Sequence, residues 1–479
     1  MGDSDALIWT MTRDPVLRSP IVVVILLDRV PNWDDVSDRL ERLTEWLPRL
    51  RSRAVPRPPG GGNPRWELDP DFAVSRHLRV LGTPPPGTLR SVLDVAQSMG
   101  TAPFDPELPL WEAAAVVGLQ DDSAALVLKV HHSVVDGMAG IDTLLHILDR
   151  RRTPAADRSA SRIRSTHPPA PDGSGRSSAA GSTSNQALSI LSHCIEALSR
   201  TRSATTGFLT DAVAAASHPA STLTGAMSTA RSMVQLLAPA PTPLSPLLTG
   251  RGIERHFEVL DLPEAALHRS AGAMGCTMND VFVAGVLGGM KLYHDIQGST
   301  VKHLRGLLPI SIRTASDPAG GNRFVPTRFV LDARISDPAE RIRHVHGQTE
   351  GWKHNPALEM SNAVAYLLNR LPPVMTRLTF GAMLKGGDFV ATNVPGPPFA
   401  TYLAGARVNR IYGFAPPSGA AVNVALLTTA GRGCIGINAD MAAVPDTTLL
   451  AKCIRRGLLQ VTRLPAGPAA RPLTGRIPT

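Results

Sequence analysis

Apolar runs and their spacing predict alternating strands and helices in the first 150 residues. Residues 19–27 form a β-branched run bounded by prolines, as expected of a buried strand. Residues 34–51 place apolar side chains about 3.6 positions apart, which predicts an amphipathic helix. Residues 111–118 and 124–130 indicate two strands joined by a short turn, and residues 139–150 predict a helix that follows them.

The second half of the chain predicts another mixed α/β region beginning near Pro243. The expected helices are 263–274, 279–294 and 337–353, and the expected strands are 304–313, 326–332, 387–393, 421–429 and 433–439. Residues 431–436 match the pattern GxGxxG of dinucleotide-binding loops. That motif should open a helix, but the residues after it have the pattern of a strand, so we interpret it as a hairpin turn.

Length and composition suggest two domains with a polar segment between them. A chain of 479 residues is longer than a domain with a single hydrophobic core usually is. Arg, Ser, Pro, Gly and Thr dominate residues 151–186, which predicts a disordered linker. Residues 187–236 have helical spacing and few charges, so they either pack as helices or lie on a lipid surface. The expected division is 1–150 as the N-terminal domain, 151–186 as the linker, 187–242 as a helical crossover, 243–462 as the C-terminal domain and 463–479 as a flexible tail.

The charge and the cysteine content limit which binding partners and which cellular compartment we expect. The net charge is +9, and five of these charges come from the segment between Arg151 and Gln235, where 9 arginines face 4 acids. No basic run is interleaved with aromatic residues, so we do not expect nucleic-acid binding. Four separated cysteines indicate neither a zinc site nor a disulfide framework. We expect a cytoplasmic protein that at most lies peripherally on the inner face of the membrane or on lipid bodies, because no secretory signal or spanning run is present.

The most informative stretch is His131-His132-Ser-Val-Val-Asp136-Gly137 at the end of a predicted strand. Successive side chains of a strand point to opposite faces, so only one histidine can enter a cleft while the other faces the interior. Asp136 and Gly137 indicate an irregular turn, and we expect Asp136 to brace it by pairing with an arginine from elsewhere. A metal site is the alternative, with three possible ligands but no second cluster to complete it. A histidine that is merely part of the core is the other alternative.

These residues resemble the HHxxxDG signature of the bacterial wax ester synthase/acyl-CoA:diacylglycerol acyltransferase family. That family belongs to the CoA-dependent acyltransferases, with chloramphenicol acetyltransferase and peptide-synthetase condensation domains among its relatives. Further similar elements follow one another along the chain: Pro109-Leu-Trp111, Thr277-Met-Asn279-Asp-Val281, Pro309-Ile-Ser-Ile-Arg313, Gly321-Asn322, Asn393-Val-Pro-Gly-Pro397, Leu403-Ala-Gly-Ala406, Asn423 and the segment Asp440 to Asp446. The resemblance therefore covers nearly the whole length.

Three features depart from the family pattern. The opening Ser4-Asp-Ala-Leu-Ile-Trp9 ends in Trp where Phe is commoner, which bears on the shape of the acyl pocket. Phe282 stands where a smaller aliphatic residue is usual, and the 151–186 linker has no counterpart. None of the three touches the histidine pair.

The resemblance implies an α/β fold of two chloramphenicol-acetyltransferase-like domains with a tunnel at their interface. It implies that His132 is the general base, supported by His131, Asp136 and Gly137. Asn279 is the candidate donor to the oxyanion, and Asn393 has a comparable claim. No cofactor is expected to be bound, acyl-CoA is the co-substrate, and basic residues at the tunnel mouth would suit its phosphates. No metal is expected.

The expected reaction is transfer of a long-chain acyl group from acyl-CoA to a lipid hydroxyl. The acceptor is then diacylglycerol, giving triacylglycerol, or a long-chain alcohol, giving a wax ester. One alternative is the same chemistry on another alcohol acceptor. A different class of function is an inactive relative that binds lipid or coats storage droplets, although the intact histidine motif argues against it.

Overall fold

The computed structural model describes residues 1–57, 62–153, 242–311, 322, 324–353, 369 and 373–464. Most of the predicted linker, the helical crossover and the tail lie outside these ranges. Within the described part no single helix is long and apolar enough to cross a membrane, whereas the bent pair Glu264–Met274 and Met278–Ile296 passes that test by length and composition.

Two six-stranded sheets form the framework, in the order β11-β12-β1-β6-β5-β4 and β7-β14-β13-β10-β8-β9. The first comprises β1 (Pro20–Leu27), β4 (Leu78–Gly82), β5 (Trp111–Val117), β6 (Ala124–His131), β11 (Tyr402–Leu403) and β12 (Ala406–Phe414). The second comprises β7 (Arg255–Pro263), β8 (His303–Ser311), β9 (Phe324–Asp332), β10 (Phe389–Pro395), β13 (Val422–Thr429) and β14 (Arg432–Asp440). A small hairpin pairs β2 (Ser52–Val55) with β3 (Arg65–Leu68).

Helices cover both faces of the first sheet. Apolar residues of α2 (Trp33–Trp46) and α4 (Gly137–Leu145) share one core with Ile25 and Leu126, whereas α3 (Leu89–Thr101) packs on the opposite face with Val22 and Val127. The predicted helix 34–51 is shorter than expected, because the chain passes at Pro48 into a 3₁₀ turn. Proline cannot donate the backbone hydrogen bond that an α-helix needs.

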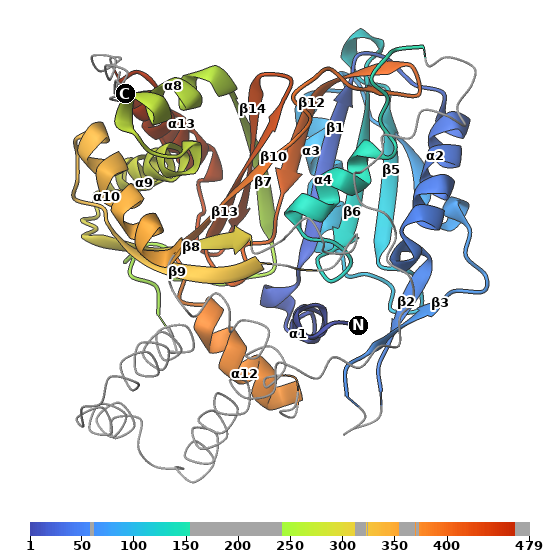
Figure 1. Ribbon diagram of the computed structural model, residues 1–479, viewed down its shortest axis with the longest axis horizontal. Coiled ribbons are helices and arrows are strands. Elements are labelled where there is room, and N and C mark those ends of the chain that lie inside the picture. The colour runs from blue at the N-terminus through green and yellow to red at the C-terminus, as the bar shows by residue number, and fades with distance from the viewer. Residues whose placement is uncertain are drawn as a thin grey trace, which may run out of the picture.

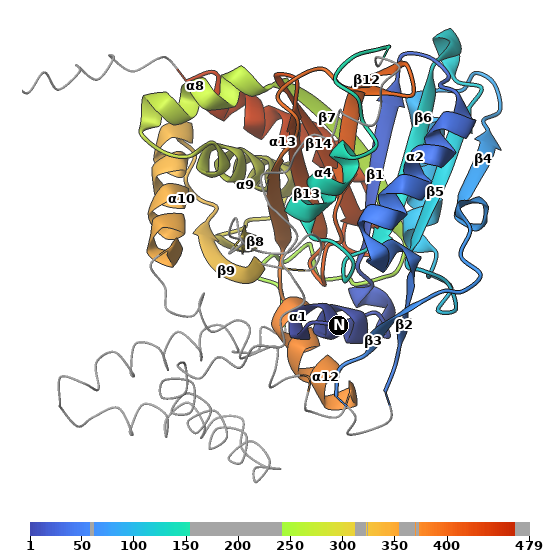
Figure 2. The same ribbon diagram turned by 45° about the vertical axis from the view of Figure 1, so that its right-hand side comes forward.

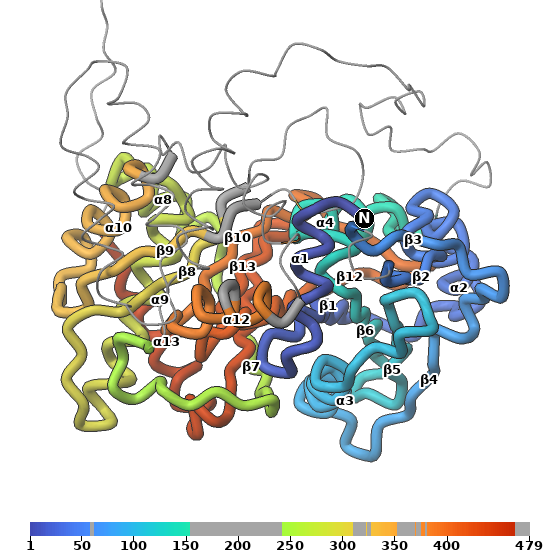
Figure 3. The backbone as a smooth tube through the Cα atoms, turned by 90° about the horizontal axis from the view of Figure 1, so that it is seen from below, coloured from blue at the N-terminus to red at the C-terminus, as the bar shows by residue number. Residues whose placement is uncertain are grey.

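The second sheet is covered by α8 (Glu264–Met274), α9 (Met278–Ile296), α10 (Pro338–Lys353) and α13 (Thr447–Thr462). Helices α9 and α13 approach closely, since a Cβ at Gly289 would lie 2.4 Å from the Cα of Ile454. Seen from below, α1 (Asp3–Met11) and α12 (Pro373–Leu384) lie side by side beneath the two sheets, and the two helices contact each other (Figure 3).

The expected mixed α/β class and most of the expected strands are confirmed. The residues of the GxGxxG pattern lie at the β13–β14 turn and in β14, as the hairpin interpretation predicts, with Ala430 and Gly431 at positive φ.

The division of the chain at residue 243 differs from the structure in one respect. Strands β11 and β12 come from the C-terminal half but extend the N-terminal sheet, where β12 pairs with β1 (Figure 1). The two sheets touch at this crossover, since a Cβ at Gly436 would lie 2.1 Å from the carbonyl oxygen of Gly413. Figure 2 shows α4 between the strands of the two halves, so the end of β6 lies where both meet.

Candidate active site

His131 is the histidine that faces the interior. It is 1% exposed. Its Nδ1 accepts a hydrogen bond from the backbone N–H of Ser133 at 3.1 Å, so the ring proton is on Nε2, 2.7 Å from the Thr12 hydroxyl. Burial lowers the pKa of His131 to about 3, with smaller contributions from His132 and Lys129. His131 is therefore neutral, and both of its ring nitrogens have partners: Nε2 links the end of β6 to Thr12 at the end of α1, and Nδ1 bonds Ser133 in the turn after β6.

His132 lines a large cavity, and its ring is oriented by Asn322. The Nδ1 of His132 lies 2.8 Å from the side-chain oxygen of Asn322. The amide nitrogen of Asn322 donates to the His132 carbonyl at 2.6 Å and to Asp5 at 2.8 Å, so its oxygen must face the ring. His132 therefore carries its proton on Nδ1 and its basic lone pair on Nε2. Burial lowers the pKa of His132, and the charge of Asp136 and the Asn322 bond offset this in part.

Asp5 fixes Asn322 from behind. It is 3% exposed, and its Oδ1 accepts from the backbone N–H of Asn322 at 3.0 Å as well as from the side chain. Its Oδ2 forms an ion pair with Arg49 at 2.9 Å. In the sequence, Asp5 and Asn322 stand out only as members of the family motifs Ser4 to Trp9 and Gly321-Asn322. Their partnership with His132 joins segments up to 317 residues apart, and no local spacing could reveal it.

Asp136 and Gly137 start the helix after the histidine pair. The Asp136 side chain caps α4 by accepting from the backbone N–H of Ala139 at 2.8 Å. Pairing of Asp136 with an arginine stays a prediction. Gly137 lets β10 come close, because a Cβ there would lie 3.0 Å from the Cγ2 of Val394.

The cavity next to His132 has an empty volume of about 1180 Å³. Its walls come from the face of the first sheet, from α2 and α4, and from β10 and β13 of the second half. Apolar side chains dominate, and the lining includes Ile21, Val23, Leu40, Leu43, Leu50, Trp111, Leu128, Val130, Val135, Ile141, Leu144, Ile147, Val394, Leu426 and Leu427. Trp111 belongs to the Pro-Leu-Trp element. Such a chamber suits a long apolar group with one polar reacting end.

Neither asparagine considered as an oxyanion donor lines this cavity. Asn279 lies in the first turn of α9, beside the capping box that Thr277 and Asp280 form. Asn393 lies on β10 between Thr392 and Val394, which do line the cavity, so its side chain points to the other face of the strand. The structure thus brings His132, Asp136 and Gly137 together at the cavity and leaves Asn279 and Asn393 outside it.

Two of the three departures from the family pattern, Trp9 and Phe282, lie outside the cavity lining. Trp9 packs against the edge of the N-terminal core, and Phe282 is fully buried in the C-terminal core. Among the described residues, no group of three or more His, Cys, Asp or Glu side chains is arranged to hold a metal ion.

Comparison with known families decides the class of the protein. Residues 5–282 match the catalytic domain of wax ester synthase/diacylglycerol acyltransferase, and residues 320–461 match the C-terminal domain of the same proteins. The chain belongs to the wax ester synthase/diacylglycerol acyltransferase family. It is an O-acyltransferase of this type, as expected from its sequence.

Relatives and solved structures agree with this assignment. A Mycobacterium tuberculosis H37Rv protein named as a diacylglycerol O-acyltransferase is 33% identical over 481 residues, covering 100% of this chain and 95% of its own length. Another from the same organism, named as the diacylglycerol O-acyltransferase tgs1, is 28% identical over 92% of this chain and 89% of its own. The wax ester synthase/diacylglycerol acyltransferase structure from Marinobacter aquaeolei VT8 has a TM-score of 0.61 at 20% identity and covers 96% of this chain and 97% of its own.

Condensation domains of peptide synthetases have a similar fold. The first condensation domain of the calcium-dependent antibiotic synthetase has a TM-score of 0.59 at 16% identity, and the match covers 98% of this chain and 96% of that domain. The expected two-domain architecture of the chloramphenicol acetyltransferase type is confirmed.

Proposed function

We propose that the protein transfers a long-chain acyl group from acyl-CoA to the hydroxyl of a lipid alcohol, with His132 as the general base. The observation that carries this is the tautomer of His132. Asn322 holds the ring proton of His132 on Nδ1, so the basic lone pair is on Nε2. His132 itself lines the large apolar cavity. Family membership supplies the acyl-CoA and the alcohol as reactants.

The reaction then follows from the positions of these groups. Nε2 of His132 takes the proton of the acceptor hydroxyl as the oxygen attacks the thioester carbonyl carbon. The tetrahedral intermediate collapses with breakage of the carbon–sulfur bond, and the CoA thiolate leaves and takes the proton from the imidazolium. No covalent acyl-enzyme forms.

The environment of His132 supports its role as a base at neutral pH. Because burial lowers its pKa, the ring is neutral at pH 7 and can accept a proton. The apolar cavity holds the acyl chain, and each buried methylene adds about 0.8 kcal/mol to binding. Keeping water from the thioester favours transfer to the alcohol over hydrolysis.

Incubation of the pure protein with labelled palmitoyl-CoA tests the proposal. Separate reactions contain diacylglycerol, long-chain alcohols, other alcohols or no acceptor. We expect labelled triacylglycerol or wax ester to form and the label to remain on CoA without an acceptor. If product forms only with another class of alcohol, that alcohol is the acceptor instead of a lipid alcohol. Binding of lipid without turnover would contradict the enzymatic role.

A further inference from the structure

Helix α1 reaches both histidines of the motif from outside the large cavity. At its C-terminal end, the hydroxyl of Thr12 lies 2.7 Å from Nε2 of His131. In its first turn, Asp5 accepts two hydrogen bonds from Asn322, the residue that orients the ring of His132. The structure describes every residue of α1, and none of them lines the cavity. The helix therefore contacts the reacting group only at a distance, through other side chains.

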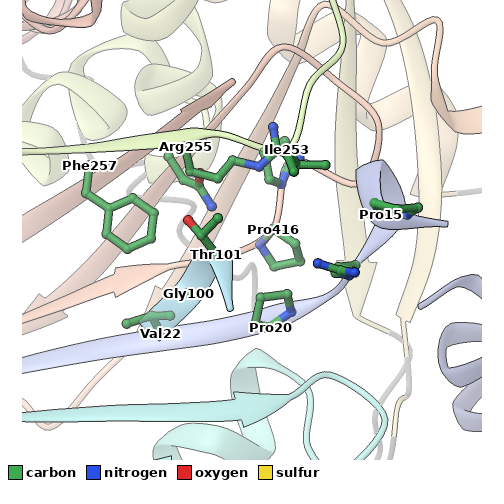
Figure 4. A pocket seen from close by; sticks show the side chains of 12 residues that line it. Pro15, Pro20, Val22, Gly100, Thr101, Ile253, Arg255, Phe257 and Pro416 are labelled. Atoms are coloured by element: carbon green, nitrogen blue, oxygen red, sulfur yellow. The ribbon is translucent and has the colours of Figure 1, made fainter. Parts of the chain in front are cut away.

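Helix α1 is anchored at its C-terminal end to both halves of the molecule. Asp14, which follows the helix, caps the 3₁₀ turn Pro15–Leu17 and forms an ion pair with Lys385, just after α12, at 2.6 Å. Pro15 of this turn lies along a smaller pocket of about 410 Å³ between the two halves (Figure 4). The two helices also contact each other. The position of Asp5 is therefore set by packing that does not involve the histidines.

The hydrogen bonds between Asp5 and Asn322 have a fixed direction. An ionised carboxylate can only accept, and Oδ1 of Asp5 accepts from the backbone N–H of Asn322 at 3.0 Å and from its amide nitrogen at 2.8 Å. The same amide nitrogen donates to the carbonyl of His132 at 2.6 Å. Turning the amide over would bring its oxygen against two other oxygens, so the oxygen stays at Nδ1 of His132. Asp5 thus helps to decide which ring nitrogen of His132 carries the proton.

The carboxylate of Asp5 is buried, and both of its oxygens are used. Oδ1 binds Asn322, and Oδ2 forms the ion pair with Arg49 at 2.9 Å. Arg49 comes from the 3₁₀ turn Pro48–Arg51 after α2, and its side chain is 26% exposed. Burial of a charge is costly unless the charge is paired and hydrogen-bonded, and Asp5 meets both conditions. A stable negative charge is therefore held directly behind Asn322.

The charge of Asp5 also acts on the ring of His132. Burial lowers the pKa of His132, whereas the charges of Asp136 and Asp5 raise it. The adjacent ring of His131 is neutral, because burial lowers its pKa to about 3. Arg49 is bonded to Oδ2, the oxygen of Asp5 that does not contact Asn322. A positive ring in a buried site is stabilised by nearby negative charge, so Asp5 favours the imidazolium.

We propose that Asp5 is a positioning residue of the acyl transfer. Through Asn322 it holds the ring proton of His132 on Nδ1, and its charge stabilises the imidazolium that forms when Nε2 takes the proton of the alcohol. Asp5 itself takes no proton, since the proton passes from the hydroxyl to Nε2 and then to the departing CoA thiolate. This role rests on the proposed function. It makes α1 part of the catalytic apparatus, although the helix lies outside the chamber.

Two substitutions of Asp5 separate its hydrogen bond from its charge. Asp5→Asn keeps an oxygen that can accept from Asn322 but removes the charge. Because that charge raises the pKa of His132, we expect the acidic limb of the kcat/KM profile to move to lower pH. Asp5→Leu removes both, and we expect kcat to fall about 10–100-fold with KM for palmitoyl-CoA unchanged within about twofold. The control is Asp34→Asn, an exposed acid in the first turn of α2, which should change neither the rate nor the pH profile.

A double-mutant cycle tests whether Asp5 acts through Asn322. We expect the double variant Asp5→Leu/Asn322→Leu to match Asn322→Leu alone in kcat/KM within about twofold, because the same relay is broken in both proteins. Losses that multiply would mean that the two residues act independently and would overturn the relay. Circular dichroism of each variant shows whether it is folded.

Nuclear magnetic resonance reads the tautomer of His132 without turnover. Long-range proton–nitrogen correlation spectra of the full chain with isotope-labelled histidine show which ring nitrogen carries the proton, and His132→Ala identifies the signal. We expect the proton on Nδ1 in the wild type and in Asp34→Asn, and a mixture of both tautomers in Asp5→Leu. A folded Asp5→Leu with the wild-type tautomer and the wild-type pH profile would overturn the proposal.

The two proposals fail separately. If His132→Ala loses transfer but Asp5→Leu matches the wild type in rate, pH profile and tautomer, Asp5 has no positioning role and the proposed function stands. If no acceptor consumes palmitoyl-CoA but the tautomer of His132 depends on Asp5, the proposed function fails and the relay from Asp5 to His132 stands.

Discussion

His131 and His132 are neighbours in the chain and carry their protons on opposite ring nitrogens. The alternation of side chains along β6 predicts that one ring faces inward and the other a cleft, and this much follows from the sequence. The tautomer of His132 does not, because Asn322 reaches it from 190 positions away. Local patterns cannot report such a contact.

In the proposed reaction Asn322 acts through His132, so we class it as a positioning residue. Asn322→Leu removes the acceptor that fixes the tautomer, and we expect kcat/KM to fall at least about tenfold with little change in KM for palmitoyl-CoA. The bond to Asn322 raises the pKa of His132, so its loss should move the acidic limb of the rate profile to lower pH. Asn409→Leu, on β12, serves as a control. An unchanged pH profile would make Asn322 merely structural.

The pH dependence of stability should reflect His131. In the unfolded chain the ring takes up a proton below about pH 6.5, whereas in the folded protein its pKa is about 3. The unfolded state therefore binds more protons between these values, and the stability from the neutral ring is present above pH 6.5 and lost as the pH falls toward 3.

His131→Gln removes this titration. We expect its thermal midpoint to be lower than that of the wild type at pH 7.5, but to fall less between pH 7.5 and pH 5. The control is His268→Gln, because the side chain of His268 is 61% exposed in the folded protein. This variant should keep the pH dependence of the wild-type thermal midpoint. A pH dependence of His131→Gln identical to that of the wild type would contradict a buried neutral ring.

At the scale of elements, strand β6, its turn and helix α4 form one unit that the sequence predicts well. Apolar runs fix the strand, and Asp136 and Gly137 mark the start of the helix. The predicted helix 139–150 begins within two residues of the observed start of α4 at Gly137. Its predicted end is too late, because the helix stops at Leu145. Helix α4 forms one wall of the large cavity, so under the proposed function its small residues set the room for the acyl chain.

Gly140 lies one turn into α4 and lines the cavity. A Cβ there meets nothing closer than 3.9 Å, so Gly140→Leu should fold and fill part of the chamber. We expect it to lower kcat/KM for palmitoyl-CoA strongly and for short-chain acyl-CoA little. Gly272→Leu, on the exposed face of α8, is the matched control and should keep the wild-type preference. An unchanged chain-length profile in Gly140→Leu would place the acyl chain elsewhere.

At the scale of the whole molecule, the two halves are joined by strand exchange. Strand β12 was not predicted, because polar residues such as Arg407 and Arg410 interrupt its apolar pattern. Its partner β1 also lies nearly 390 residues earlier in the chain, so no local pattern links the two strands. This exchange brings Gly413 and Ala415 into the lining of the large cavity. The contribution of this C-terminal segment to the cavity is therefore visible only in three dimensions.

The contact of the two sheets at Gly436 should be essential to this arrangement. Gly436→Ala places a methyl group 2.1 Å from the carbonyl of Gly413, and we expect a loss of about 1–3 kcal/mol in stability, as for other overpacked sites. Its thermal midpoint should drop by several degrees, whereas Gly272→Ala should be neutral or stabilising. A wild-type midpoint for Gly436→Ala would show that the two halves do not meet as closely as described.

The steady-state rate of palmitoyl transfer to the preferred acceptor by His132→Ala, compared with His268→Ala, tests the role of His132 most directly. With circular dichroism showing both variants folded, we expect His132→Ala to lose about 10²–10⁴-fold in kcat and His268→Ala to match the wild type. A folded His132→Ala that transfers the acyl group at the wild-type rate would contradict the account.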